Sequence, residues 1–238
     1  MKKRTKILLK RAGAITIALA MSLSSANGYV PQNVRVVQAA EIAGDTIANN
    51  SLRIKVGDLG QIAEMNIVNN RTNNYGNQVN FVLPNDSSPQ NNANHQWMGE
   101  MIFSYRTSKD GTFPEDNSGF TEVDTNKTMA AGGTTTCSDV NTDNPYIEKK
   151  VIGDKKVEVT YKGLEEDSDV ERAMKGFNVS SVYDMETKDG SLLWNITLKN
   201  TSENYIEFGD VGLPMPWNNK YPEVDNVYNE RVTAHTFA

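Results

Sequence analysis

Apolar and polar residues alternate with a period of two along much of the chain, which is the pattern of a strand with one buried face. The clearest run covers residues 156–162, where Val157, Val159 and Tyr161 alternate with polar residues. Further strand-like runs lie at residues 51–56, 63–68, 147–152, 177–185, 192–198 and 206–211. The pattern predicts antiparallel strands with one solvent-exposed face, and the fold class that we expect is all-β.

Short turn sequences separate these runs and predict hairpins. Residues 57–60, Gly153-Asp154 and Asp189-Gly190 each stand between two alternating runs. Glycine tolerates the positive φ that tight hairpin turns require, so we expect the runs on either side of Asp189-Gly190 to pair. In the second of these runs Trp194 alternates with Leu192 and Ile196, which predicts that Trp194 is a core residue.

Several segments lack a strand pattern. Residues 84–95 and 109–126 are rich in Asn, Ser, Asp, Gly and Pro, and we expect long loops there. Residues 168–174 are the one place where a short helical turn is expected. Residues 230–238 have strand-like alternation with no polar tail after them, so we expect the chain to be a fragment of a longer polypeptide.

The first 40 residues are typical of a bacterial signal peptide. A basic stretch leads into an apolar run from Ala12 to about Leu23, which is shorter than the roughly 20 apolar residues of a membrane-spanning helix. Two cleavage sites are candidates, one ending at Ala26 and one ending at Ala40. We favour the second, because the composition turns acidic at Glu41. We therefore expect a secreted protein with one domain over residues 41–238.

Charge makes a nucleic-acid partner improbable. The chain has 24 basic and 30 acidic residues, and residues 1–40 hold seven of the basic and none of the acidic ones. The mature chain then carries a formal charge of −13 rather than −6. Such a surface repels phosphate backbones. Cys137 is the only cysteine, so a disulfide within the chain is excluded.

We predict no metal and no cofactor. The two histidines, His95 and His235, are 140 residues apart and do not form a zinc-binding motif. Residues 139–144 mimic the start of a calcium loop, but Asn144 stands where glycine is wanted and Lys150 where the bidentate glutamate should be. An ordinary polar turn fits better. The acidic run 165–169 is likewise interpreted as a solvated loop.

Carboxylates and aromatic residues are the candidates for carbohydrate chemistry. Glycoside hydrolysis needs two carboxyl groups, and five acidic residues lie on or beside predicted strands. These are Asp58, Glu64, Glu100, Glu207 and Asp210. Glu207 and Asp210 are the preferred acidic candidates, although a structural role at a strand edge or turn fits each of them better. Sugar rings pack on flat aromatic side chains, and four such residues lie in or beside predicted loops. They are Trp97, Trp217, Tyr221 and Tyr228.

Two neighbouring segments carry a resemblance to a known group of proteins. LWNITLKNTS (residues 193–202) followed by IEFGDVGLPMPWN (residues 206–218) resembles the end of the N-terminal β-supersandwich that precedes a six-hairpin glycosidase domain in secreted bacterial proteins. Within that group the chain resembles an uncharacterised family known only as a domain of unknown function. Residues 54–69 and 97–106 fit the same pattern. The resemblance implies an antiparallel β-sandwich of the supersandwich, galactose-mutarotase-like type over nearly the whole mature chain.

The motifs of this resemblance are structural and transfer no catalytic residue. In such proteins the acid and the base usually come from the helical toroid, which these 238 residues lack. The resemblance therefore implies a scaffold or cleft-supporting domain of a glycoside hydrolase-like protein, with a polysaccharide or oligosaccharide and a C-terminal catalytic domain of the same polypeptide as partners. The alternative is a self-sufficient carbohydrate-binding or surface-adhesion module. A hydrolase or lyase site within the sandwich is a third hypothesis.

Overall fold

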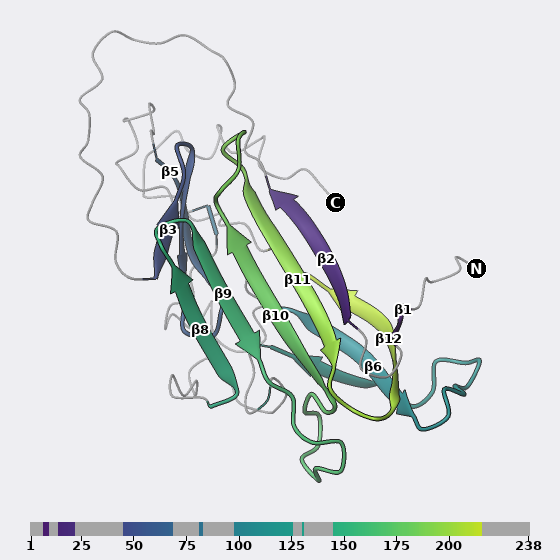
Figure 1. The fold of residues 1–238 in the computed structure, drawn as a ribbon. Helices are drawn as coiled ribbons and strands as arrows, with labels where there is room; N and C mark the ends of the chain where they lie inside the picture. The colour runs from purple at the N-terminus through teal and green to yellow at the C-terminus, as the bar shows by residue number, and fades with distance from the viewer. Residues whose placement is uncertain are drawn as a thin grey trace, which may run out of the picture.

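The computed structural model describes residues 7–9, 14–21, 45–68, 81–82, 98–125, 130 and 145–215. In these ranges twelve strands pair antiparallel in three sheets (Figure 1). Their bounds are β1 Ile7–Leu9, β2 Ala14–Met21, β3 Thr46–Ala48, β4 Leu52–Val56, β5 Ile62–Ile67, β6 Ile102–Ser108, β7 Thr121–Asp124, β8 Ile147–Ile152, β9 Lys156–Tyr161, β10 Phe177–Asp184, β11 Leu192–Asn200 and β12 Tyr205–Gly212. Nowhere in the described ranges is there a helix long and apolar enough to cross a membrane.

The five-stranded sheet, in the order β2-β11-β10-β9-β8, confirms the strongest strand predictions. Buried and half-buried residues alternate without interruption along β10. β10 and β11 pair from Phe177 opposite Asn200 to Asp184 opposite Leu193, so the hairpin at Asp189-Gly190 is as predicted. Asp189 accepts hydrogen bonds from the hydroxyl and from the backbone N–H of Ser191, and these hydrogen bonds lower the pKa of Asp189.

The four-stranded sheet, in the order β1-β12-β6-β7, corrects one loop prediction. The predicted loop over residues 109–126 contains strand β7 at Thr121–Asp124, which pairs with β6 and buries Val123. In β12 the register against β6 shifts between Phe208 and Asp210, so Gly209 is the extra residue of a β-bulge. This sheet carries the two preferred acidic candidates.

The three-stranded sheet, in the order β3-β4-β5, shows where simple alternation was wrong. The alternation over residues 63–68 predicts that Ala63, Met65 and Ile67 share the buried face, but Ile67 is 38% exposed and Ile62 is buried. The register between β4 and β5 shifts at Val56, which pairs with Ile62, while Lys55 pairs with Glu64. The extra residue changes which face the following side chains occupy.

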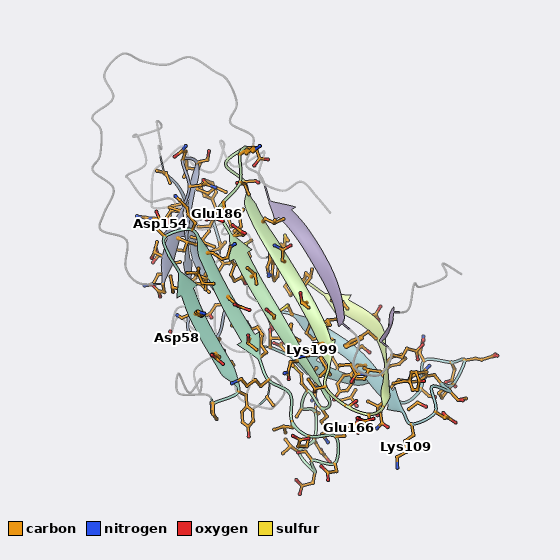
Figure 2. All side chains as sticks on the ribbon, viewed as in Figure 1. Asp58, Lys109, Asp154, Glu166, Glu186 and Lys199 are labelled. Carbon is orange, nitrogen blue, oxygen red and sulfur yellow. The ribbon has the colours of Figure 1, made fainter. Side chains whose placement is uncertain are left out.

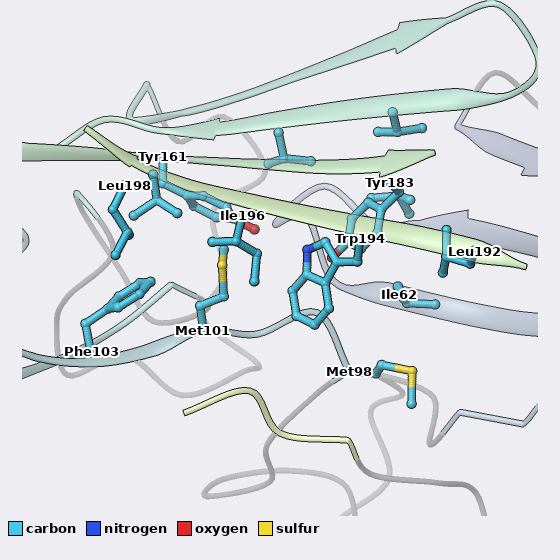
Figure 3. Close-up of a cluster of buried hydrophobic side chains, with 14 of the residues drawn as sticks. Ile62, Met98, Met101, Phe103, Tyr161, Tyr183, Leu192, Trp194, Ile196 and Leu198 are labelled. Carbon is cyan, nitrogen blue, oxygen red and sulfur yellow. The ribbon is translucent and has the colours of Figure 1, made fainter. Parts of the chain in front are cut away.

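A single hydrophobic core joins the three sheets. In Figure 1 the five-stranded sheet forms one layer, and the other two sheets lie behind it. Trp194 is completely buried in the cluster drawn in Figure 3, as its alternation predicted, and its indole Nε1 donates to Ser181 Oγ at 2.8 Å. Phe177 of β10 contacts Phe208 of β12 with ring centroids 5.2 Å apart, which ties the five-stranded to the four-stranded sheet.

Two tyrosines tie the five-stranded sheet to the turn before β5. The Tyr161 hydroxyl donates to the carbonyl of Leu59 at 2.7 Å, and the Tyr183 hydroxyl donates to the carbonyl of Gly60 at 2.8 Å. Both rings are buried, and this burial raises the pKa of each hydroxyl. Gly60 has φ +83°, a conformation that favours glycine, so the predicted turn sequence has a direct structural role.

Strands β1 and β2 come from the segment that the sequence predicts to be a signal peptide. β2 pairs with β11 over Ala14–Met21, and β1 pairs with β12 over Ile7–Leu9, so each lies at an edge of its sheet. Every second residue of β2, from Ile15 to Met21, is the register partner of a buried β11 residue. The structure is that of the uncut chain, and signal cleavage stays a prediction.

Candidate functional site

The aromatic candidates lie outside the described residues. Trp97, Trp217, Tyr221 and Tyr228 are in this group. Cys137, both histidines and the calcium-like segment 139–144 lie outside as well. Their predicted roles stay predictions. All five acidic candidates lie within the described residues, and two of them are on β12.

Glu207 and Asp210 occupy different environments on β12. Glu207 is buried and is the register partner of Arg106 on β6, and its Oε2 accepts a hydrogen bond from Arg106 Nε at 2.6 Å. Asp210 follows the bulge and is exposed. Glu207 therefore forms a buried ion pair. This contact agrees with a structural role, which the sequence analysis favoured over catalysis.

The other acidic candidates do not gather around these two. Asp58 lies in the turn after β4 and forms an ion pair with Lys149 of β8, with a distance of 2.9 Å from Nζ to Oδ1. Glu64 is the register partner of Lys55, and Glu100 is 1% exposed just before β6. Among the described residues, no group of three His, Cys, Asp or Glu side chains is placed to hold a metal ion.

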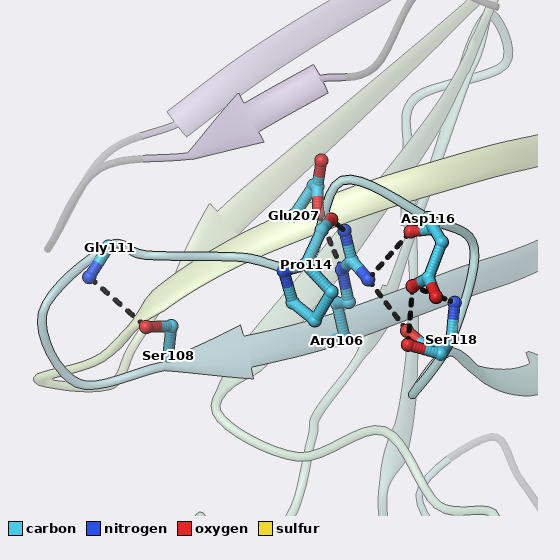
Figure 4. A network of polar contacts seen from close by, with 7 residues as sticks. All are labelled: Arg106, Ser108, Gly111, Pro114, Asp116, Ser118 and Glu207. Carbon is cyan, nitrogen blue, oxygen red and sulfur yellow. Dashed lines mark hydrogen bonds and ion pairs between the residues drawn. The ribbon is translucent and has the colours of Figure 1, made fainter.

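Arg106 fixes the loop over residues 109–120 onto the outer face of β6. Its Nη1 donates to the carbonyls of Asp116 and Ser118 at 3.1 and 2.6 Å, and its Nη2 donates to the carbonyl of Pro114 (Figure 4). The guanidinium lies 4.4 Å from the ring centroid of Phe120, at cation–π distance. A planar group with five donors suits a loop that presents several carbonyls at once.

The entry into this loop is held by local hydrogen bonds. Asp110 accepts hydrogen bonds from the backbone N–H of Thr112 and from the hydroxyl of Ser108, each at 2.9 Å. The bond from the Thr112 backbone is the main cause of a lowered pKa of Asp110, with the Ser108 hydroxyl next. Gly111 turns with φ +83° against the ring of Tyr205. Hydrogen bonds therefore fix the backbone of this loop at its start, through Asp110, and at its middle, through Arg106.

A second loop, residues 164–176, is fixed to the same strand. The Tyr105 hydroxyl donates to the carbonyl of Ala173 at 2.6 Å and accepts from the backbone N–H of Lys175 at 3.1 Å. Burial raises the pKa of Tyr105 to about 12. The loop closes on itself where Leu164 bridges Lys175. The helical turn predicted over residues 168–174 is wrong, because this backbone is anchored outward to Tyr105 and makes no helix.

Arg172 in the second loop has a strained backbone. Its φ is +54°, in the left-handed region that non-glycine residues rarely adopt. The side chain is exposed, whereas the next two residues, Ala173 and Met174, are completely buried. Among the described residues, no carboxylate pairs with the Arg172 guanidinium. The turn thus buries two residues and leaves a cation at the surface.

The two loops enclose a groove of about 700 Å³, which we call the end groove. Tyr105 and Arg106 of β6 line it, at the point where β6 leaves β7: Tyr105 is the last residue of β6 that pairs with β7, opposite Thr121, and Arg106 follows it. Its lining also includes Phe113 and Pro114 from the first loop, and Glu166, Glu171, Arg172 and Lys175 from the second. In Figure 2, Glu166 and Lys109 mark this end of the molecule, opposite Asp154 and Glu186.

Sequence reasoning missed the end groove as a site. It identified residues 109–126 as a long loop, and it assigned the acidic run 165–169 to a solvated segment, but nothing in either pattern places the two side by side. Tyr105 and Arg106 bring them together, and both belong to β6, a strand that the alternation pattern did not predict. Both residues are buried although they are consecutive on a strand, where one of two neighbours is usually exposed. The loops cause this burial, so the local sequence does not predict it.

The described residues define an all-β protein built from antiparallel sheets. Comparison of the chain with protein-family models, with curated proteins and with solved structures found no match.

Proposed function

We propose that this chain is the N-terminal β-sandwich domain of an extracellular, glycoside hydrolase-like protein, and that it supports a substrate cleft without being the catalytic centre. The observation that carries the proposal is the buried Arg106–Glu207 ion pair, at 2.6 Å, which holds the wall of the end groove in place. Glu207, one of the two preferred acidic candidates, thus supports a surface through Arg106.

Glycosidase chemistry makes this observation informative. A catalytic carboxyl group protonates the leaving oxygen or attacks the sugar, so one of its oxygens must reach the substrate. Glu207 is 8% exposed, and its Oε2 is held by Arg106. Removing Glu207 would also release the loop that Arg106 fixes. These features favour a supporting role for this acid over a catalytic one.

The resemblance supplies the carbohydrate context. Three antiparallel sheets around one core agree with a sandwich scaffold, and the supersandwich type with a helical catalytic domain after it is part of the proposal. The end groove offers a surface of matching chemistry, because aromatic, carboxylate and guanidinium side chains line it together. The alternative, a self-sufficient carbohydrate-binding or adhesion module, would use Trp97 and Trp217 in its loops.

The test uses the full chain and the longer polypeptide that contains it. We expect the full chain to release no reducing sugar from a panel of plant, fungal and bacterial polysaccharides. We expect the longer polypeptide to hydrolyse one of them, and to lose activity and thermal stability when residues 41–238 are deleted. Hydrolysis by the full chain alone would refute the scaffold role. Tight glycan binding that Trp97→Ala or Trp217→Ala abolishes would support the module instead.

A further inference from the structure

Arg172 is an unexpected residue for its backbone position. Glycine, asparagine and aspartate adopt positive φ at lower cost than a long side chain does, and Arg172 has φ +54°. The side chain forms no ion pair with a described carboxylate, so no such contact offsets the strain. Strained residues of this kind cluster at binding sites, where the surrounding structure enforces them. The side chain of Arg172 is therefore the feature that needs an explanation.

The surrounding structure enforces this conformation. Ala173 is buried with its carbonyl bonded to the Tyr105 hydroxyl, and the Met174 backbone N–H donates to the carbonyl of Ala130 at 3.2 Å. These contacts fix the backbone immediately after Arg172. The Lys175 side chain points its Nζ to the carbonyl of Ser168 at 2.6 Å and closes the same loop. Arg172 is thus presented by a rigid turn at the end groove.

The lining of the groove has balanced charge. Glu166 and Glu171 are exposed carboxylates, and Arg172 and Lys175 are the cations on the same loop. Arg106 of β6 is already neutralised by Glu207. Phe113 adds a half-buried ring on the opposite loop. A ligand with many hydroxyl groups and no net charge matches this set, because hydroxyls donate to carboxylates, accept from guanidinium groups, and leave C–H faces for an aromatic ring.

We infer that the end groove binds a neutral oligosaccharide, with Arg172 donating hydrogen bonds to its hydroxyls and Phe113 packing on a sugar face. The carbohydrate class rests on the proposed function, whereas the location and the roles of the two residues rest on the groove itself. A uronic acid fits less well, because Glu166 and Glu171 line the same groove as Arg172 and repel a carboxylate.

The experiment measures binding by the full chain with isothermal titration against neutral oligosaccharides and against uronate-containing oligosaccharides of equal length. We expect binding to a neutral member of the panel and weaker binding to its acidic counterpart. Arg172→Gly should weaken the binding by about tenfold or more, the effect of losing a charged hydrogen-bond donor. The same variant should unfold at a higher temperature, because glycine relieves the strain at positive φ.

Two further variants sharpen the test. Phe113→Ala should weaken binding as Arg172→Gly does. Lys188→Ala removes an exposed cation beside the other hairpin end, at residues 185–190, and should leave binding unchanged. Binding that is equal in Arg172→Gly and in the unmodified chain would overturn the inference, as would a panel in which no neutral oligosaccharide binds.

The outcomes separate this inference from the proposed function. If no oligosaccharide binds but deletion of residues 41–238 still impairs the longer polypeptide, the groove assignment fails and the scaffold role stands. If Arg172→Gly abolishes sugar binding but the longer polypeptide degrades no carbohydrate, the groove assignment stands and the glycoside hydrolase-like role fails.

Discussion

Tyr105 and Arg106 are consecutive residues of β6, and they fasten two different loops to this one strand. Successive side chains of a strand point to opposite faces. Tyr105 bonds Ala173 from the core side, where its ring packs on Phe177 with centroids 4.9 Å apart. Arg106 bonds the 109–120 loop from the outer side. The end groove exists because both faces of one strand serve as anchors.

Glu207→Ala should strongly destabilise the protein. The substitution leaves the guanidinium of Arg106, whose side chain is 5% exposed, without its carboxylate partner. An unpaired buried charge costs about 3–5 kcal/mol. Glu207→Gln is the control, because it keeps a hydrogen-bond acceptor and should cost less. The free energy of unfolding from denaturant titration measures both effects. A Glu207→Ala value within a few tenths of the unmodified protein would show that the ion pair does not hold the loop.

The stability of the protein should fall as the pH rises from about 10 to about 12. Burial raises the pKa of Tyr105 from 10.0 to about 12, so in this window the unfolded chain loses a proton that the folded chain keeps. The contribution is complete below pH 10 and is lost as the pH passes the folded pKa. Tyr161 and Tyr183 act in the same direction.

Tyr105→Phe tests this assignment. It removes the hydroxyl that bonds Ala173 and Lys175, at a cost of about 1–3 kcal/mol near neutral pH. It should also make the alkaline loss of stability shallower without abolishing it. Denaturant unfolding at several pH values, with tyrosinate absorbance to follow ionisation, gives both readings. An unchanged slope between pH 10 and 12 would mean that Tyr105 ionises as it does in the unfolded chain.

The sequence could predict strands whose partners also alternate. Tyr161 and Trp194 are buried where period two placed them, because each belongs to an uninterrupted strand. The bulges near Ala63 and at Gly209 could not be predicted, since a bulge depends on the register against another strand. Strand β7 was missed because Val123 is its one buried residue, and a single buried residue produces no alternation of apolar and polar positions.

The candidate site was less predictable than the strands. Glu207 was identified as a notable acid, but its partner Arg106 is 101 residues away in the chain. The three carbonyls that Arg106 binds belong to the backbone, and a backbone carbonyl leaves no signature in the sequence. The positive φ of Arg172 is likewise imposed by tertiary contacts of its neighbours and contradicts the local preference of arginine.

Ser181→Ala should destabilise the core by about 1–3 kcal/mol. The indole N–H of Trp194 donates to Ser181 Oγ at 2.8 Å, and both residues are completely inaccessible. The substitution leaves this donor buried and without an acceptor. Ser180→Ala is the matched control on the other face of β10, and its cost should stay within about 0.5 kcal/mol. Equal unfolding free energies for the two variants would contradict the role of the hydrogen bond.

Gly60→Ala should cost much more stability than Gly153→Ala. Both glycines have positive φ, at +83° and +63°, so alanine is strained by about 1 kcal/mol at either position. A Cβ at Gly153 meets no atom within 4 Å, whereas a Cβ at Gly60 collides with the Tyr161 hydroxyl and Val159. The collision should add about 1–3 kcal/mol. Thermal and denaturant unfolding would measure the difference, and similar losses for both variants would contradict the contact.

Removal of residues 1–40 should promote self-association. The predicted signal cleavage deletes β1 and β2, which cover the edges of β12 and β11. β11 then presents an open edge along the positions that β2 had paired, from Leu192 to Lys199, and an open edge is a template for pairing with another chain. We expect residues 41–238 to form dimers or larger species at concentrations where the uncut chain is monomeric.

Sedimentation velocity over a range of concentrations measures this association. A chain that lacks only residues 1–6 is the control, because it keeps both edge strands and should behave as the uncut chain does. The introduction of proline by Thr16→Pro in the uncut chain removes a donor from β2 opposite Thr197 and should reproduce part of the effect. The prediction would be wrong if residues 41–238 stayed monomeric and unfolded at the same denaturant concentration as the uncut chain. That result would show that β1 and β2 neither prevent association nor stabilise the rest of the fold.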